Sequence, residues 1–288
     1  MRKKRRISLK RITFVLCCLV AASGLVMAGC FRTKPLAASS LDDPESLTVP
    51  ELLQTVSLKT AQAFPDGFVL RKTTAWPGLV QVEKTMVLPG EPSYEILCFD
   101  NQDNGIPMTL RMTRTEGNRQ QILAARRIEQ GWEVMDMFDR NPVHSPAQDI
   151  PAWVILDALS LDSFSIPEKY PALFCLEAQS EGNAVSWAWH PMDEQELRQA
   201  VSDDQQLHKL GNPYFSQFSE TLETSREGVL TWAAYHQAAT ESTAERTVEI
   251  TVSDEAGMPD RDLLEGLFSV SWKQGDMLQL PWADAFAA

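Results

Sequence analysis

The sequence predicts an α+β fold: an N-terminal helix covers an antiparallel β-meander, and a mixed helix and strand half follows. Two observations carry this prediction. Residues 48–64 repeat apolar side chains with the period of a helix, whereas residues 68–138 alternate apolar and polar side chains between closely spaced turn residues. Consecutive strands with short links form a meander, and the opening helix is the natural cover for its apolar face.

The opening helix has clear start and stop signals. Residues 48–51 read Thr-Val-Pro-Glu, which fits a capping box with proline in the first turn. Residues 65–67 read Pro-Asp-Gly, which ends a helix. The side expected to face the sheet consists of Leu53, Val56, Thr60, Ala63 and Phe64.

The remaining elements follow from the same two periods. Turn residues divide the segment 68–138 into about six strands. After a loop at residues 141–150, helices are expected at 151–159, from Asp193, at 213–222 and at 259–267. Strands are expected at 172–177, 184–190, 229–236 and 246–252.

The first thirty residues have the features of an export signal. Seven basic residues and no acid occupy residues 1–11, and residues 12–29 carry no charge. Residues 26–30 read Val-Met-Ala-Gly-Cys, which resembles the lipobox of bacterial lipoprotein precursors, with Met27 where leucine is more usual. The resemblance implies removal of residues 1–29 and acylation of Cys30. It also implies anchorage to a membrane of the cell envelope, the outer membrane facing the periplasm if the source has two membranes.

Two alternatives stay open for this segment. The apolar run is near the shortest that spans a bilayer, so an uncleaved transmembrane helix is one of them. Residues 5–10, Arg-Arg-Ile-Ser-Leu-Lys, are similar to the twin-arginine export motif, although Ser8 stands where that motif has phenylalanine. Each reading exports the chain from Cys30 onward, and residues 30–47 are expected to form the lipidated cysteine and a flexible tether.

Composition restricts the partners of the exported part. Residues 30–288 hold 19 basic and 39 acidic residues, a net charge of −20, and residues 141–288 account for −17 of it. This argues against nucleic acid and against binding to an anionic lipid surface, because both attract basic patches. The asymmetry suggests two units, residues 48–140 and 141–288, although a single domain of this length is also normal.

Two cysteines remain after the signal and the lipobox, Cys98 and Cys175, and both fall in strand-like runs. An oxidising compartment permits a disulfide between them. Two unpaired thiols that pack as small hydrophobic side chains explain the sequence equally well.

The sequence contains no complete catalytic, cofactor or metal motif, so we expect no cofactor and no metal site. Its four histidines are at least 18 residues apart, which excludes local signatures such as His-Glu-x-x-His. The candidate ligand-binding residues lie in two similar segments and are Trp187, Trp189, His190, Trp232 and His236. Trp187 and Trp189 share a strand face that could stack on a sugar or line an apolar groove. Packing in the core and ordinary histidines at strand ends are the simpler interpretations.

Two classes of function remain. The first is a non-enzymatic binding or accessory domain that is tethered to the envelope by Cys30 and binds a protein, an apolar molecule or a glycan through its sheet. The alternative is an envelope hydrolase that uses His190 or His236 as a base with a carboxylate. A large hollow behind the sheet would favour an apolar ligand, whereas a filled core would favour protein contacts.

Overall fold

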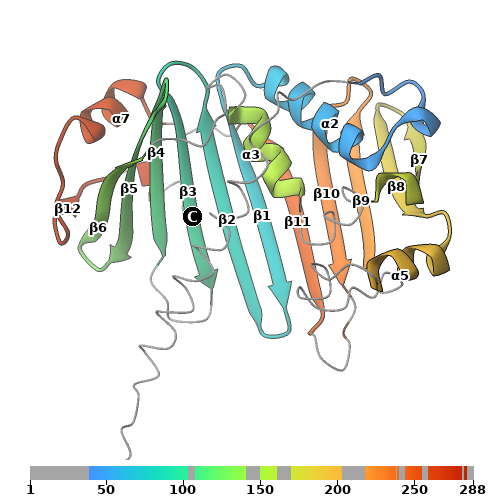
Figure 1. Cartoon of the computed structure of the whole chain (residues 1–288). Coiled ribbons are helices and arrows are strands. Elements are labelled where there is room, and N and C mark those ends of the chain that lie inside the picture. The colour runs from blue at the N-terminus through green and yellow to red at the C-terminus, as the bar shows by residue number, and fades with distance from the viewer. Residues whose placement is uncertain are drawn as a thin grey trace, which may run out of the picture.

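Twelve strands of the chain form one antiparallel sheet (Figure 1). The computed structural model describes residues 39–102, 108–140, 150–160, 170–202, 218–237, 239, 244–254, 259–280 and 282–283. Across the described sheet the strand order is β12-β6-β5-β4-β3-β2-β1-β11-β10-β9-β8-β7. All neighbouring strands in this order are antiparallel.

The described helices and strands have the following bounds. The helices are η1 (Pro44–Ser46) and η3 (Pro171–Leu173), both 3-10, and α2 (Val49–Ala63), α3 (Ile150–Leu159), α5 (Glu194–Ser202) and α7 (Arg261–Phe268). The first six strands are β1 (Phe68–Trp76), β2 (Leu79–Leu88), β3 (Ser93–Gln102), β4 (Thr109–Glu116), β5 (Arg119–Ile128) and β6 (Gly131–Arg140). The others are β7 (Phe174–Glu181), β8 (Ala184–Pro191), β9 (Phe218–Ser225), β10 (Leu230–Gln237), β11 (Arg246–Ser253) and β12 (Met277–Leu278).

Most of the predicted elements are confirmed. The six expected strands are β1–β6, which follow one another as a meander, and the expected helices α2, α3, α5 and α7 are present. The helix expected at residues 213–222 is wrong over 218–222, which belong to strand β9, and residues 213–217 lie outside the described residues. The signal peptide, Cys30 and residues 31–38 of the expected tether also lie outside them.

The predicted fold class is wrong in its architecture. Helix α2 does not cover a separate meander, and the second half is not a mixed unit beside it. Strand β1 pairs along its other edge with β11, with Thr74 opposite Val248, so both halves of the chain share one sheet. This pairing joins segments far apart in the sequence, and local periodicity carries no information about it.

Strand β1 also marks the point where the buried face of the sheet changes. We call the side of Phe68 and Leu70 the front face and the side of Val69 the back face, because successive side chains of a strand alternate. Phe68 and Leu70 belong to the core around α2 and α3, whereas Val69 belongs to the core around α7. Both α2 and α3 lie in front of the sheet in Figure 1, and α7 lies at its β4–β6 end.

The front-face core joins α2 and α3 to strands β7–β11. Thr48 caps α2 in the predicted capping box, since its hydroxyl accepts from Glu51 N and Glu51 accepts from Thr48 N. Helix α3 is apolar around most of its circumference and almost wholly buried, as expected for a helix enclosed by other elements. The main apolar side chains that these helices cover are Leu176, Trp187, Leu222, Leu230, Ala233, Tyr235, Val248 and Ile250.

The back-face core joins α7 and the segment after it to the meander. Its strand side chains include Met86, Ile96, Met112, Leu123 and Trp132, and its cover includes Leu264, Phe268, Leu278 and Leu280. Polar contacts hold α7 in place. Glu265 accepts from the Tyr94 hydroxyl at 2.6 Å and from the Arg114 guanidinium at 3.0 Å. These bonds lower the pKa of Glu265, while burial and the Glu265 carboxylate raise the pKa of Tyr94 to about 12.

Candidate functional site: the open face of β7–β11

The back face of β7–β11 is the strongest candidate for a binding surface. Apart from Trp232, the large apolar side chains of these strands point to the front, where they belong to the front-face core. The exposed side chains on the back include Glu177 and Gln179 of β7, Ala188 of β8, and Glu249 and Thr251 of β11. We call this surface, the back-face side chains of β7–β11, the open face.

Strand register arranges the open face in rows. One row crosses four strands through Gln179, Ser186, Glu223 and Trp232. A second row runs through Thr221, Ala234 and Glu249. Because antiparallel neighbours lie about 4.8 Å apart, these side chains form one continuous layer.

The open face is acidic. Strand alternation places Glu177, Glu181, Glu223 and Glu249 on it, and no lysine or arginine of these five strands points to this side in the described residues. Within the described ranges, basic side chains lie only at its borders, where Arg71 of β1 is opposite Thr251 and Arg226 directly follows β9. A surface with this charge attracts cationic partners and repels anionic ones.

The predicted tryptophans divide between the two faces. Trp187 and Trp189 do share a strand face, but it is the front, where Trp187 is 2% exposed and donates from Nε1 to Thr224 Oγ1 at 3.0 Å. Trp189 packs against the same core. Trp232 instead lies half-buried on the open face, opposite Glu223. Of the three, Trp232 alone is therefore placed to contact a partner of that face.

His190 forms a small polar cluster with two side chains of β7. Its Nε2 lies 3.0 Å from Cys175 Sγ and 3.9 Å from Glu177 Oε1. Cys175 and His190 are directly opposite each other in the β7–β8 pair, which explains the short contact. The side chains of His190 and Glu177 are 53% and 60% exposed, so the cluster is open to solvent.

His236 lies on the same face as His190 but in a different contact. Its Nε2 is 2.9 Å from Glu245 Oε1, and the two side chains are 42% and 56% exposed. Each predicted histidine thus has an acid nearby, as a hydrolase would require. Neither lies in a described pocket, however, and strand β9 separates β8 from β10.

The two cysteines are far apart. Cys98 is buried in the back-face core and Cys175 lies at the outermost strand, and both are free thiols. Six strands lie between β3 and β7, a separation of roughly 34 Å along the sheet, whereas a disulfide needs Cα atoms within about 7 Å. The predicted option of a disulfide between them is therefore wrong. Burial, with a smaller effect of Asp100, raises the pKa of Cys98 to about 11.

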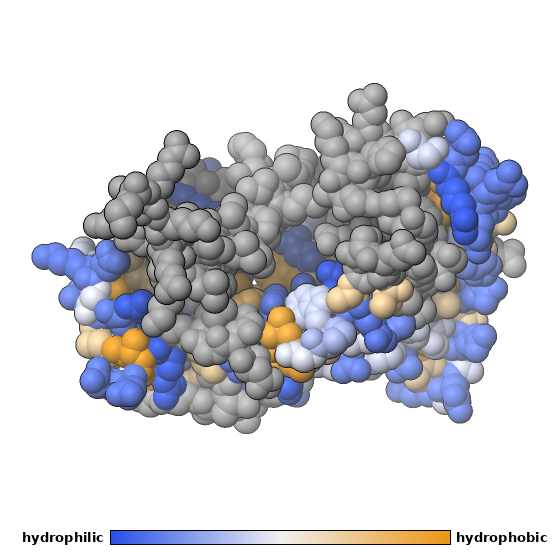
Figure 2. All heavy atoms as spheres, turned by 90° about the horizontal axis from the view of Figure 1, so that it is seen from below, coloured by the Kyte–Doolittle hydropathy of each residue, from blue (hydrophilic) through white to orange (hydrophobic). Residues whose placement is uncertain are grey.

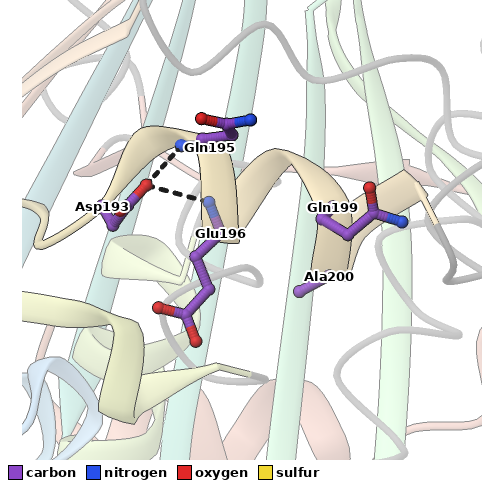
Figure 3. Close-up of a pocket in the computed structure, with 5 residues that line it drawn as sticks. All are labelled: Asp193, Gln195, Glu196, Gln199 and Ala200. Atoms are coloured by element: carbon purple, nitrogen blue, oxygen red, sulfur yellow. Dashed lines mark hydrogen bonds between the residues drawn. The ribbon is translucent and has the colours of Figure 1, made fainter.

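The described pocket is an open depression beside α5. It has a volume of about 510 Å³ and is lined by Asp193, Gln195, Glu196, Gln199 and Ala200 (Figure 3). Asp193 caps the helix, because its carboxylate accepts from Gln195 N at 2.7 Å and from Glu196 N at 3.0 Å. Asp193 therefore has a structural role, and a depression this open does not enclose a ligand as a binding pocket would.

Three further observations concern the rest of the described residues. No group of three or more histidine, cysteine, aspartate or glutamate side chains in them is arranged to hold a metal ion. Each helix within the described ranges falls short of the length and hydropathy that crossing a bilayer demands. Seen from below, the described surface is mainly hydrophilic, and apolar residues form only small groups on it (Figure 2).

Sequence reasoning missed the contact between Cys175 and His190, although a signal for it was present. Residues 181–184 read Glu-Gly-Asn-Ala, and Gly182 has a φ of +59° in the turn between β7 and β8. A two-residue turn of this composition sets Glu181 opposite Ala184. Counting outward from that pair places Cys175 opposite His190.

Comparisons with known proteins give no relative from which a function could be transferred. No family model matches the chain, and no curated protein matches it. A solved porin-like protein from Bacteroides uniformis overlaps 66% of this chain and 96% of its own, at 6% identity and a TM-score of 0.19. The MucA/MucB complex of Pseudomonas aeruginosa overlaps 69% of this chain and 97% of its own, at 6% identity and a TM-score of 0.11. Likenesses this weak support no inference about fold or function.

Proposed function

We propose that this protein is a lipid-anchored, non-enzymatic accessory domain of the bacterial cell envelope that binds a basic protein surface through the open face. Cys30 is its anchor, and the membrane holds the domain where its partner lies. The observation that carries the proposal is the exposed, acidic back face of β7–β11.

The shape and charge of the open face support a protein partner. The open face extends over five strands and presents Trp232 beside Glu223. Glu249 and Glu177 are exposed around this pair. Tryptophan at the centre of an interface and charged side chains at its rim are the usual arrangement of protein contacts. Four glutamates without a basic neighbour in the same strands favour a partner rich in lysine or arginine.

The opposite face of the same strands gives less support to an apolar ligand. The side chains of α2 and α3 pack directly on the front of β1 and β7–β11. Trp153, Ile155 and Leu159 of α3 are each at most 4% exposed, so the described part of this face is filled. An apolar molecule would have to displace α3 to reach the sheet there.

A hydrolase is the second candidate, and the histidine contacts are its best support. In a catalytic triad the nucleophile and the orienting acid bind different nitrogens of the imidazole. Here Cys175 and Glu177 both approach the same nitrogen, Nε2 of His190. His236 has Glu245 at 2.9 Å but lies on an open surface. We therefore favour binding over hydrolysis.

Site-specific photo-crosslinking in cells tests the open face. A photo-reactive amino acid replaces Ala188 or Thr251, which are exposed on the open face, and Gln130, which is exposed in the β5–β6 turn, serves as the control position. We expect one discrete protein adduct from positions 188 and 251 and none from 130. Adducts of equal yield from all three positions would contradict the proposal.

Charge reversal then tests the chemistry of the partner. Glu181→Lys together with Glu249→Lys should abolish the adduct from position 251. Glu129→Lys together with Asp136→Lys changes the net charge equally at exposed positions outside the open face, and should leave it unchanged. Loss of the adduct in both double variants, or in neither, would refute recognition of a basic surface by the open face.

The anchor has its own test. Replacing Cys30 with serine should block incorporation of labelled fatty acid and release the chain from the membrane fraction. Unchanged labelling and fractionation would leave the crosslinking results intact but would remove the lipid anchor from the proposal.

A further inference from the structure

Cys175 is the more accessible of the two thiols among the described residues, and it differs from Cys98 in burial and in its position in the sheet. Cys98 is 3% exposed and lies in the back-face core. Cys175 is half-buried in β7, the last strand of the sheet, and its sulfur faces the solvent side together with His190 and Glu177. The part of the chain that the structure describes thus contains one protected and one approachable thiol.

The position of His190 lets it take the proton of the Cys175 thiol. The 3.0 Å separation between Sγ and Nε2 is a hydrogen-bond contact, and Nε2 is the acceptor in the tautomer that carries its proton on Nδ1. Only the thiolate attacks disulfides, so a neighbouring base that accepts the proton makes the sulfur reactive. Glu177 Oε1 lies 3.9 Å from the same nitrogen and completes the cluster on this face.

The charge around Cys175 should make its reaction with a disulfide depend on the charge of that disulfide. Glu177 and Glu181 of the same strand lie on the same face as the thiol, and Glu223 of β9 adds a third negative charge to that face. His190 is the one neighbouring group on β8 that becomes positive. An anionic disulfide is therefore repelled from the open face, whereas a cationic one is attracted.

We propose that Cys175 is a modification site at which the protein takes up small disulfides, cationic ones in preference to anionic ones, with His190 as the base. The thiol proton moves to His190 Nε2, and the Cys175 sulfur attacks one sulfur of the reagent. The S–S bond of the reagent breaks, a new S–S bond forms to Cys175, and the departing thiolate takes the proton from the imidazolium. Cys175 is oxidised and one sulfur of the reagent is reduced, so the exchange needs no other reactant.

The experiment measures modification of the full chain by cystamine, a cationic disulfide, and by oxidised glutathione, an anionic one. Peptide mapping locates and times the adduct. We expect it on Cys175, formed faster with cystamine, and we expect added salt to narrow the difference because screening weakens both interactions. Cys98 should react only after unfolding. Reaction of Cys98 at the rate of Cys175, or equal rates for both reagents at low salt, would overturn the proposal.

Two histidine variants separate a base from a structural role. His190→Gln should slow the cystamine reaction by about tenfold or more at neutral pH, with the difference disappearing at alkaline pH, where the thiol ionises unaided. His236→Gln removes a histidine from the same face that is not in contact with Cys175, and should leave the rate unchanged. Equal rates for the two variants across the pH range would exclude His190 as the base. Unfolding curves that match the wild type show that neither change acts through the fold.

This inference is independent of the proposed protein partner. Cys175→Ser should abolish the adduct with cystamine in the purified protein, where no partner is present, so this reaction succeeds or fails without regard to photo-crosslinking from position 251. Failure of one experiment therefore leaves the other interpretable.

Discussion

The two ends of the sheet use the same strand pattern but bury opposite faces. Strands β2–β6 place Met86, Ile96 and Leu123 on the back, beneath α7 and the segment that follows it. Strands β7–β11 place Trp187, Leu222 and Ile250 on the front, beneath α2 and α3. The comparison teaches that alternation identifies an apolar side of each strand, whereas the segments that return to cover the sheet determine which of its two faces becomes core.

The largest expected effect on stability is a difference between the front face and the open face of β7–β11. Trp187→Ala removes a 2% exposed indole from the front-face core and should lower the free energy of unfolding by about 3–5 kcal/mol. Trp232→Ala removes a half-buried indole from the open face and should cost less than about 1 kcal/mol. Chemical denaturation of the two variants measures the difference. Equal losses would mean that the open face is covered in solution.

A smaller effect is expected where α7 is attached at the other end. Glu265→Gln weakens the hydrogen bonds from Tyr94 and Arg114 and should cost about 1 kcal/mol, because the carboxylate is largely exposed. The pKa of Glu265 is lowered in the fold from 4.5, so its contribution is present above that value and lost as pH falls through the folded pKa. The difference between wild type and variant should therefore shrink in acid. A difference that is constant from pH 7 to pH 3 would contradict this assignment.

The smallest of these effects concerns the cap of α2. Thr48→Ala leaves Glu51 N without its acceptor and should cost about 1 kcal/mol or less. Ser46→Ala, two residues earlier and outside the capping box, is the matched control and should be nearly neutral. Thermal unfolding followed by circular dichroism compares them. A larger loss for Ser46→Ala would show that η1, not the cap, stabilises this part of the fold.

Local elements could be predicted because their signals are local. The capping box at Thr48, the apolar run of α3 and the alternation of β4 each lie within a few residues. Strand β9 was missed because Phe218 and Leu222 are four positions apart, a spacing that suits one side of a helix and equally one side of a strand. The pattern could not distinguish the two.

The arrangement of the elements could not be predicted in the same way. The pairing of Thr74 with Val248 and the contact of Leu264 with the meander join residues distant in sequence, and no local pattern encodes them. For the candidate site, alternation alone places Trp187 and Trp189 together, but the side they face depends on α2 and α3. His190 was identified as a candidate, whereas its contact with Cys175 required the register of β7 and β8.

The pairing of β1 with β11 also determines when this polypeptide can complete its fold. Until residues 246–253 have emerged and docked, one side of β1 presents a row of unsatisfied amides and carbonyls, the kind of edge on which chains stick to one another. Truncation anywhere before β11 would leave that edge permanently bare. Nascent or clipped forms should therefore aggregate or be degraded instead of persisting as a smaller folded unit.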